Sequence, residues 1–112
     1  MLSNELTKGT LKTIILKLLA EETKMYGYEI TQHVKGLSEG KMILTEGALY
    51  PTLHKLEAEG LVKTKQVKVG KRMRKYYSLT SKGKKATVNK LAEFQEFINA
   101  MHLILKPKTT SS

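Results

Sequence analysis

Cysteine is absent from this chain of 112 residues, and so is aspartate. Without cysteine the protein has neither disulfides nor thiolate metal sites, which fits a reducing compartment. Without aspartate, no Asp carboxylate can orient a catalytic histidine, and His33, His54 and His102 are scattered along the chain. There is also no phosphate-cradling glycine motif, serine nucleophile elbow or metal-ligand cluster. We therefore expect a protein that is not an enzyme, with no cofactor and no metal.

Long apolar runs are missing as well. No stretch approaches the roughly 18 residues that cross a bilayer. The first five residues, MLSNE, lack the basic and continuous apolar regions of a signal peptide. We expect a cytoplasmic protein with no membrane partner.

Positive charge, in contrast, is abundant and unevenly placed. The 20 Lys and Arg exceed the 10 acidic residues, all of them Glu, for a formal net charge of +10. Residues 1–60 hold seven basic and eight acidic side chains, whereas residues 61–112 hold thirteen and two. The commonest partner of such a local positive field is a polyanion. The alternative is a solvated lysine-rich surface that only promotes solubility.

Apolar spacing predicts three helices in the first 60 residues. The first begins near Thr7, and its buried face is Leu11, Ile14, Ile15, Leu18 and Leu19. The second covers about residues 26–37, with Tyr26, Ile30, Val34 and Leu37 on one side. The third has Thr45 as N-cap and Gly60 just after its end, and its inner stripe is Leu49, Leu53 and Leu56. Residues 42–44 form a short apolar run that favours a minimal strand.

The periodicity then changes to that of two strands, residues 61–69 and 73–79, joined by a tip at residues 70–72. A last helix is predicted from about Thr80, its N-cap, to Leu105, and Pro107 prevents its continuation. The fold is thus predicted as mostly α with a small β-hairpin (α+β), a winged helix-turn-helix plus a C-terminal dimerisation helix. We expect a DNA-binding domain at residues 1–79, a dimerisation helix at 80–105 and a disordered tail at 106–112.

In a helix-turn-helix the second helix of the pair enters the major groove. At about 100° per residue, six residues of the third predicted helix lie away from its leucine stripe: Gly47, Tyr50, Pro51, His54, Lys55 and Ala58. The small residues permit close approach to DNA, and Tyr50, His54 and Lys55 can donate to phosphates or base edges. The alternative is an ordinary surface helix. Because no Arg or Asn stands on this face, we expect limited direct base readout.

The hairpin gives a more specific signal. Residues 63–75 contain seven basic side chains and no acid. The tip with Lys71 and Arg72, together with Arg74, can reach the DNA backbone or lie along a minor groove. A solvated edge strand protected by lysines is the competing explanation for some of these residues.

Four successive motifs resemble those of the PadR family: residues 26–30 (YGYEI), 46–53 (EGALYPTL), 56–62 (LEAEGLV) and 74–83 (RKYYSLTSKG). The resemblance implies a winged helix, a dimer built by the C-terminal helix, and repression of a nearby operon. It places Tyr50 and its neighbours, with Lys71 and Arg72, at the DNA, and we add Tyr28 and Thr45 to the predicted DNA-binding residues. The short C-terminal part resembles the compact subfamily that includes multidrug-responsive regulators.

The predicted C-terminal helix has an apolar seam with a period of 3.5 residues, made by Leu91, Phe94, Ile98, Met101 and Leu105. Val88, Ala92, Phe97, Leu103 and Ile104 add apolar surface outside the seam. A helix that is apolar on two sides must bury both, so we expect one side to cover its own domain and the other to form a homodimer. The alternative is a helix folded entirely on its own core.

Phe94 and Phe97, near the middle of this helix, are candidates to line a site for a small apolar or planar effector between subunits. Plain core packing is the alternative for both rings. The predicted function is a sequence-specific transcriptional regulator, a repressor that binds double-stranded DNA at an inverted repeat. An RNA-binding or ribosome-associated basic module is the alternative, and a winged helix that binds only protein is a further one. Tyr76 and Tyr77 are adjacent and point to opposite faces of a strand, which disfavours an RNA-stacking platform.

Overall fold

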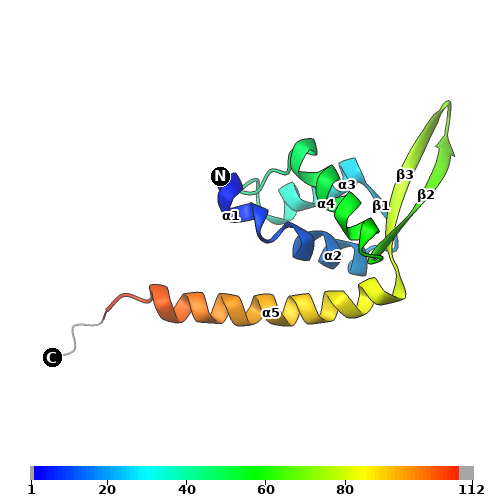
Figure 1. Cartoon of the computed structure of the whole chain (residues 1–112). Helices are drawn as coiled ribbons and strands as arrows, with labels where there is room; N and C mark the ends of the chain where they lie inside the picture. Colours follow the sequence, from blue (N-terminus) through cyan, green and yellow to red (C-terminus); the bar gives the residue numbers. More distant parts are fainter. Residues whose placement is uncertain (1, 109–112) are drawn as a thin grey trace.

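The computed structural model describes residues 2–108, and their order of elements is helix, helix, short strand, two helices, hairpin and long helix (Figure 1). The elements are α1 (Asn4–Lys8), α2 (Leu11–Glu21), β1 (Met25–Tyr26), α3 (Gly27–Leu37), α4 (Glu46–Ala58), β2 (Val62–Val69), β3 (Arg72–Leu79) and α5 (Ser81–Leu105). This confirms the predicted mostly helical fold with a winged helix-turn-helix and a long C-terminal helix. No helix among residues 2–108 is long and apolar enough to cross a membrane.

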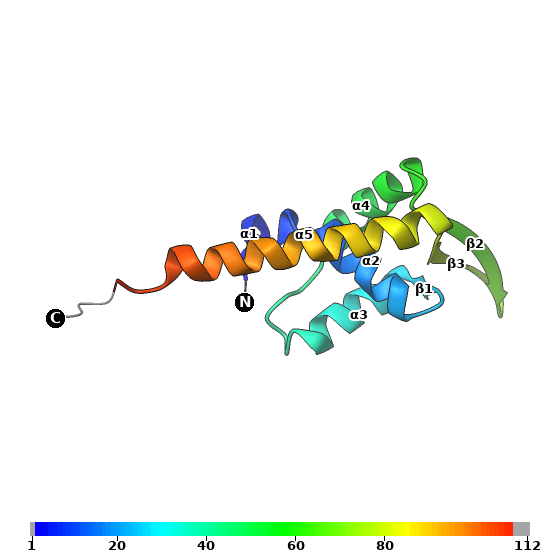
Figure 2. The same cartoon turned by 90° about the horizontal axis from the view of Figure 1, so that it is seen from below.

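The first predicted helix is wrong in one respect, because it is two helices that separate at Gly9 and Thr10. Ser3 caps α1 by accepting a hydrogen bond from the Leu6 amide at 3.3 Å. In α2 the expected stripe is buried or half-buried, but Leu16 on another side is fully buried too. The reason is that α2 lies between α5 on one side and α3 and α4 on the other (Figures 1 and 2).

The helix-turn-helix consists of α3 and α4. In α3, Ile30 and Val34 are buried as predicted, but Leu37 is 73 % exposed because the last turn extends beyond the core. Residues 42–44 form no strand, and of these Leu44 is buried in the core. Thr45 caps α4 as predicted, since its hydroxyl accepts from the Ala48 amide at 3.2 Å.

The orientation of α4 follows from its leucines. Leu49, Leu53 and Leu56 are fully buried, as the apolar spacing predicts. The chain leaves α4 through Gly60, whose φ of +75° lies in the left-handed region that favours glycine. The opposite face of α4 is therefore directed away from the core.

The sheet has the order β1-β3-β2, and both pairings are antiparallel. Its register runs from Val62 opposite Leu79 to Val69 opposite Arg72, and Gly70 and Lys71 form the turn. We call β2, β3 and this turn the wing, which projects beyond the helical body (Figure 1). Sequence patterning missed β1, because two residues are too short to show a period.

The start of α5 is joined closely to the end of α4. The Thr80 hydroxyl accepts from the Gly83 amide at 3.0 Å, as an N-cap, and donates to the Gly60 carbonyl at 2.6 Å. A Cβ on Gly83 would lie 1.9 Å from the Leu61 carbonyl oxygen, so only glycine fits here. From this joint α5 follows α2 and then extends past the body (Figure 2).

The predicted division into domains stays a prediction. The helix ends at Leu105, as expected, and Lys106 is its C-cap. Of the predicted disordered tail, residues 109–112 lie outside the described part of the chain.

Candidate nucleic-acid interface

The outer face of α4 is open to solvent. Gly47, Tyr50, Pro51, His54, Lys55 and Ala58 are all exposed. A Cβ on Gly47 would meet nothing nearer than the Thr45 hydroxyl at 4.0 Å, so the start of the helix presents almost bare backbone. Pro51 has no amide hydrogen and leaves the Gly47 carbonyl without its helical donor. The face is thus small at its start and polar in its middle, as insertion into a groove requires.

Tyr50 packs on the first turn of α3. A Cβ on Gly27 would stand 2.3 Å from the Tyr50 hydroxyl oxygen, so the absence of a side chain at position 27 makes room for the Tyr50 ring. Tyr28, the next residue of α3, is 64 % exposed. Both tyrosines line a groove of about 400 Å³ between α3 and the wing, together with Arg72 and Lys75. The structure brings Tyr28, Tyr50 and Arg72 to one groove although they lie far apart in the sequence.

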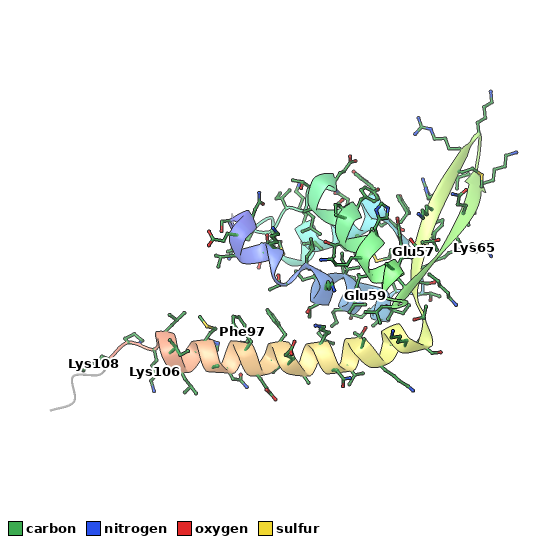
Figure 3. The ribbon with its side chains drawn as sticks, in the orientation of Figure 1. Glu57, Glu59, Lys65, Phe97, Lys106 and Lys108 are labelled. Carbon is green, nitrogen blue, oxygen red and sulfur yellow. The ribbon has the colours of Figure 1, made fainter. Side chains whose placement is uncertain are left out.

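The tip of the wing is basic and fully exposed. Gly70 adopts a φ of +61° at the turn, and Lys71 and Arg72 follow it. Long basic side chains extend from this tip, away from the body (Figure 3). Lys63, Lys65 and Lys68 are exposed along β2. Within the described residues these cations have no carboxylate partner within ion-pair distance.

Arg74 differs from the other predicted DNA-binding residues. Its side chain is half-buried, and the guanidinium carbon lies 4.0 Å from the centroid of the Tyr26 ring. Its Nη1 donates to the Tyr76 hydroxyl at 3.5 Å, and this hydrogen bond raises the pKa of Arg74. Arg74 also lines the groove of Tyr28 and Tyr50, but its guanidinium is held by contacts with Tyr26 and Tyr76, whereas Arg72 is exposed.

Tyr26 and Tyr76 were not among the residues selected from the sequence. Alternation along β3 does place positions 74 and 76 on one face. The third member, Tyr26, joins them only through the pairing of β1 with β3, which the sequence pattern does not reveal.

The apolar seam of α5 has two environments. Leu91, Phe94, Ile98 and Met101 are half-buried, and they continue the side of the helix on which Gly83 and Thr87 are buried. At the far end Leu103, Ile104 and Leu105 are exposed by 70 % or more. The seam therefore begins against the chain's own body and continues past it.

Phe94 and Phe97 stack with ring centroids 5.8 Å apart and an interplanar angle of 24°. They line a groove of about 770 Å³ between α5 and the first two helices, which also includes Leu6. Phe97 is 55 % exposed and lies on the side of α5 that faces α1 and α2 (Figure 3). Both rings thus line an accessible groove that also has charged side chains, among them Lys12 and Glu93, whereas the core consists of other residues.

A helix-turn-helix followed by a basic antiparallel wing defines the class of winged-helix DNA-binding proteins. Residues 15–89 match the model of the transcriptional regulator PadR-like family. The chain belongs to this family of transcriptional regulators, so the prediction of a PadR-type regulator that is not an enzyme is confirmed.

Individual relatives agree with this assignment. The chain is 33 % identical over 105 residues to an uncharacterised protein of Lysinibacillus sphaericus, covering 88 % of this chain and 94 % of that protein. It is 39 % identical over 67 residues to the transcriptional regulator Rv3488 of Mycobacterium tuberculosis, covering 60 % of each. The structure of a transcriptional regulator from Clostridium thermocellum superposes with a TM-score of 0.85 at 28 % identity, over 95 % of this chain and all of that one.

Proposed function

We propose that this PadR-like regulator is a cytoplasmic repressor that binds an inverted-repeat operator as a homodimer. The observation that supports it best is the exposed face of α4 beside a wing whose cations have no acidic partners among the described residues. In a winged helix these two elements meet the major groove and the adjacent backbone or minor groove. The uneven charge of the chain agrees with this arrangement.

The proposed contacts fall into two kinds. Tyr50, His54 and Lys55 on α4 would meet base edges and phosphates, with Gly47 at the point of closest approach. Tyr28, at the first turn of α3, and Lys71 and Arg72, on the wing, would bind the sugar-phosphate backbone. Thr45 uses its hydroxyl as an N-cap, so we assign it the role of fixing the start of α4 near the DNA.

The dimer would be built by α5. Its last turn exposes Leu103, Ile104 and Leu105, and burying these side chains against a second copy is favourable in water. In the groove beside them, Leu6 and Phe97 offer apolar side chains against which the partner's distal helix can pack. A two-fold axis through the paired helices would present two α4 helices to half-sites about 34–36 Å apart.

A small apolar or planar effector would enter beside Phe94 and Phe97. By changing how the two α5 helices cross, it would alter the separation of the recognition helices. Its effect is limited by its differential affinity for the two forms, commonly about 1–3 kcal/mol, which corresponds to a relief of roughly 5- to 150-fold.

A binding panel tests the function. The probes are duplex DNA from upstream of the protein's own gene, an unrelated duplex of equal length, and single- and double-stranded RNA of the same sequences. We expect tight binding to the upstream duplex, weaker binding to the unrelated one, and weak binding to RNA. Preference for RNA would overturn the proposal in favour of an RNA-binding module, and failure to bind any nucleic acid would favour a protein-interaction role.

A further inference from the structure

Four side chains of cationic and aromatic character alternate at the base of the wing. Tyr26 on β1 and Tyr76 on β3 are directly opposite in the register and meet edge to face, with ring centroids 5.6 Å apart. The Arg74 guanidinium lies over the Tyr26 ring, 4.0 Å from its centroid. The Lys24 ammonium lies over the Tyr76 ring, 4.7 Å from its centroid. We call Lys24, Tyr26, Arg74 and Tyr76 the cation–tyrosine stack.

The stack lies on the face of the sheet opposite to the core. Met25 and Tyr77, which pair with each other next to it, are buried on the inner face. A strand of only two residues offers few backbone hydrogen bonds, so β1 cannot hold the wing by its ladder alone. On the outer face of the sheet, where β1 and β3 have no contact with the core, the stack supplies the side-chain contacts between the two strands.

Tyr26 also connects the stack to the helix-turn-helix. It is the N-cap of α3, and its amide donates to the Glu29 carboxylate at 3.1 Å. The next residue, Gly27, receives the ring of Tyr50 from α4. A short chain of contacts therefore leads from the wing, through Arg74 and Tyr26, to the proposed DNA-facing tyrosine of the recognition helix.

We infer that Arg74 and Tyr26 are positioning residues that set the angle of the wing relative to α3 and α4, and that Arg74 does not itself bind DNA. The inference rests on the proposed DNA-binding function. Its basis is that the guanidinium lies over the Tyr26 ring and donates one hydrogen bond to Tyr76, while Arg72, two residues along the same face of β3, is exposed. A planar guanidinium stacks on aromatic rings and donates in fixed directions, whereas an ammonium acts as a point charge.

The experiment compares Arg74→Leu, Tyr26→Leu, the double variant and Arg74→Lys, with Arg72→Leu as the matched control for loss of one wing arginine. Dissociation constants are measured against salt on the upstream duplex and on a random-sequence duplex. We expect Arg72→Leu to lower the salt slope by about 0.9, the contribution of one phosphate contact. Arg74→Leu and Tyr26→Leu should leave the slope unchanged and weaken binding by about two- to fivefold, the size of one lost cation–π contact.

Two further results are expected from positioning. The double variant should bind no worse than either single variant, because both break the same contact. Arg74→Lys keeps the charge but not the planar donor set, so it should bind nearly as poorly as Arg74→Leu. A slope that falls by about 0.9 in Arg74→Leu, together with parental binding by Tyr26→Leu, would make Arg74 a phosphate contact and overturn the inference.

Amide hydrogen exchange without DNA separates this inference from the proposed function. Residues 67–74 should exchange faster in Arg74→Lys and Tyr26→Leu than in the parent, while α2 amides stay unchanged and report that the fold is intact. Unchanged exchange in the wing would overturn the inference even if the parent binds DNA. Faster exchange would support it as a feature of the wing even if the parent binds no duplex and the proposed function fails.

Discussion

The ring of Tyr50 on α4 rests against the backbone of Gly27 on α3, where a Cβ would stand 2.3 Å from the tyrosine hydroxyl oxygen and 2.8 Å from the ring carbon that bears it. Both atoms belong to the far end of a flexible side chain. A methyl group at position 27 is therefore expected to displace Tyr50 and to leave the core leucines of α4 in place.

Gly27→Ala should accordingly weaken binding to the upstream duplex about fivefold or more, which is the lower end of the effect of losing one DNA contact. The stability of the protein should change little. The measurement is a binding titration beside a thermal melt. In a Tyr50→Ala background the same change should have almost no further effect on binding. An equal loss in both backgrounds would show that Gly27 acts by some other route.

The close approach at Gly83 predicts a loss of stability, in contrast to the loss of DNA binding expected at Gly27. A Cβ there would meet the backbone of Leu61, which cannot move aside without shifting the end of α4. Gly83→Ala should lower the free energy of unfolding by about 1–3 kcal/mol or more. Urea denaturation at one fixed protein concentration measures this loss.

Gly36→Ala is the matched control, because a Cβ at this position in α3 meets nothing within 4 Å. It should be neutral or raise the free energy of unfolding by up to about 1 kcal/mol, since alanine favours the helix. Equal stability of the two variants would contradict the tight joint between α4 and α5.

The wing tip is expected to bind DNA through charge. Replacing Lys71 and Arg72 by Ala should weaken binding to all duplexes about equally and lower the salt slope by roughly one to two units. The control is the loss of two exposed lysines, Lys84 and Lys85, near the start of α5, which removes the same charge from another surface. If both double variants change the slope alike, general charge and not the wing accounts for the effect.

The proposed dimer depends on the exposed end of α5. Aspartate in place of Leu103 and Ile104 would bury charge in the interface at a cost of several kcal/mol, yet disturb nothing in the single chain. Sedimentation should show a folded monomer. Leu37→Asp, on an equally exposed apolar residue of α3, should leave the dimer intact. A folded dimer from the Leu103 and Ile104 variant would place the interface elsewhere.

The buried phenol of Tyr77 should make the stability of the protein fall at alkaline pH. Burial raises the pKa of its phenol above the ordinary value near 10, and the nearby Tyr50 and Glu57 raise it further. The unfolded chain therefore loses this proton at a lower pH than the folded chain does. The contribution to stability is fully present below about pH 10 and is lost as the pH rises through the folded pKa.

Tyr77→Phe removes this titration while keeping the ring. Its free energy of unfolding, followed by urea denaturation across the alkaline range, should fall less steeply above about pH 10 than that of the parent. Parallel curves for the two proteins would show that other groups set the alkaline limit.

The sequence by itself determined the elements that depend on neighbours along the chain. The helix period placed Leu49, Leu53 and Leu56 on one buried face, and the caps at Thr45 and Thr80 are where local hydrogen bonding predicts them. The seven basic residues between positions 63 and 75 marked the wing, because charge excludes a segment from the core. The four motifs were enough to indicate the PadR-like family.

Only the tertiary structure decided what depends on residues far apart. The strand β1 has no period of its own and exists because β3 pairs with it, and Tyr26 lies 50 residues before its partner Tyr76 in the sequence. That pairing brings Tyr26 beneath Arg74 and so forms the cation–tyrosine stack. For α5 the period shows which side chains share a face, but packing against α2 decides that Leu91 and Phe94 meet the body while Leu105 lies beyond it. Periodicity is a local property of the backbone, whereas the surface that a face meets is set by the whole fold.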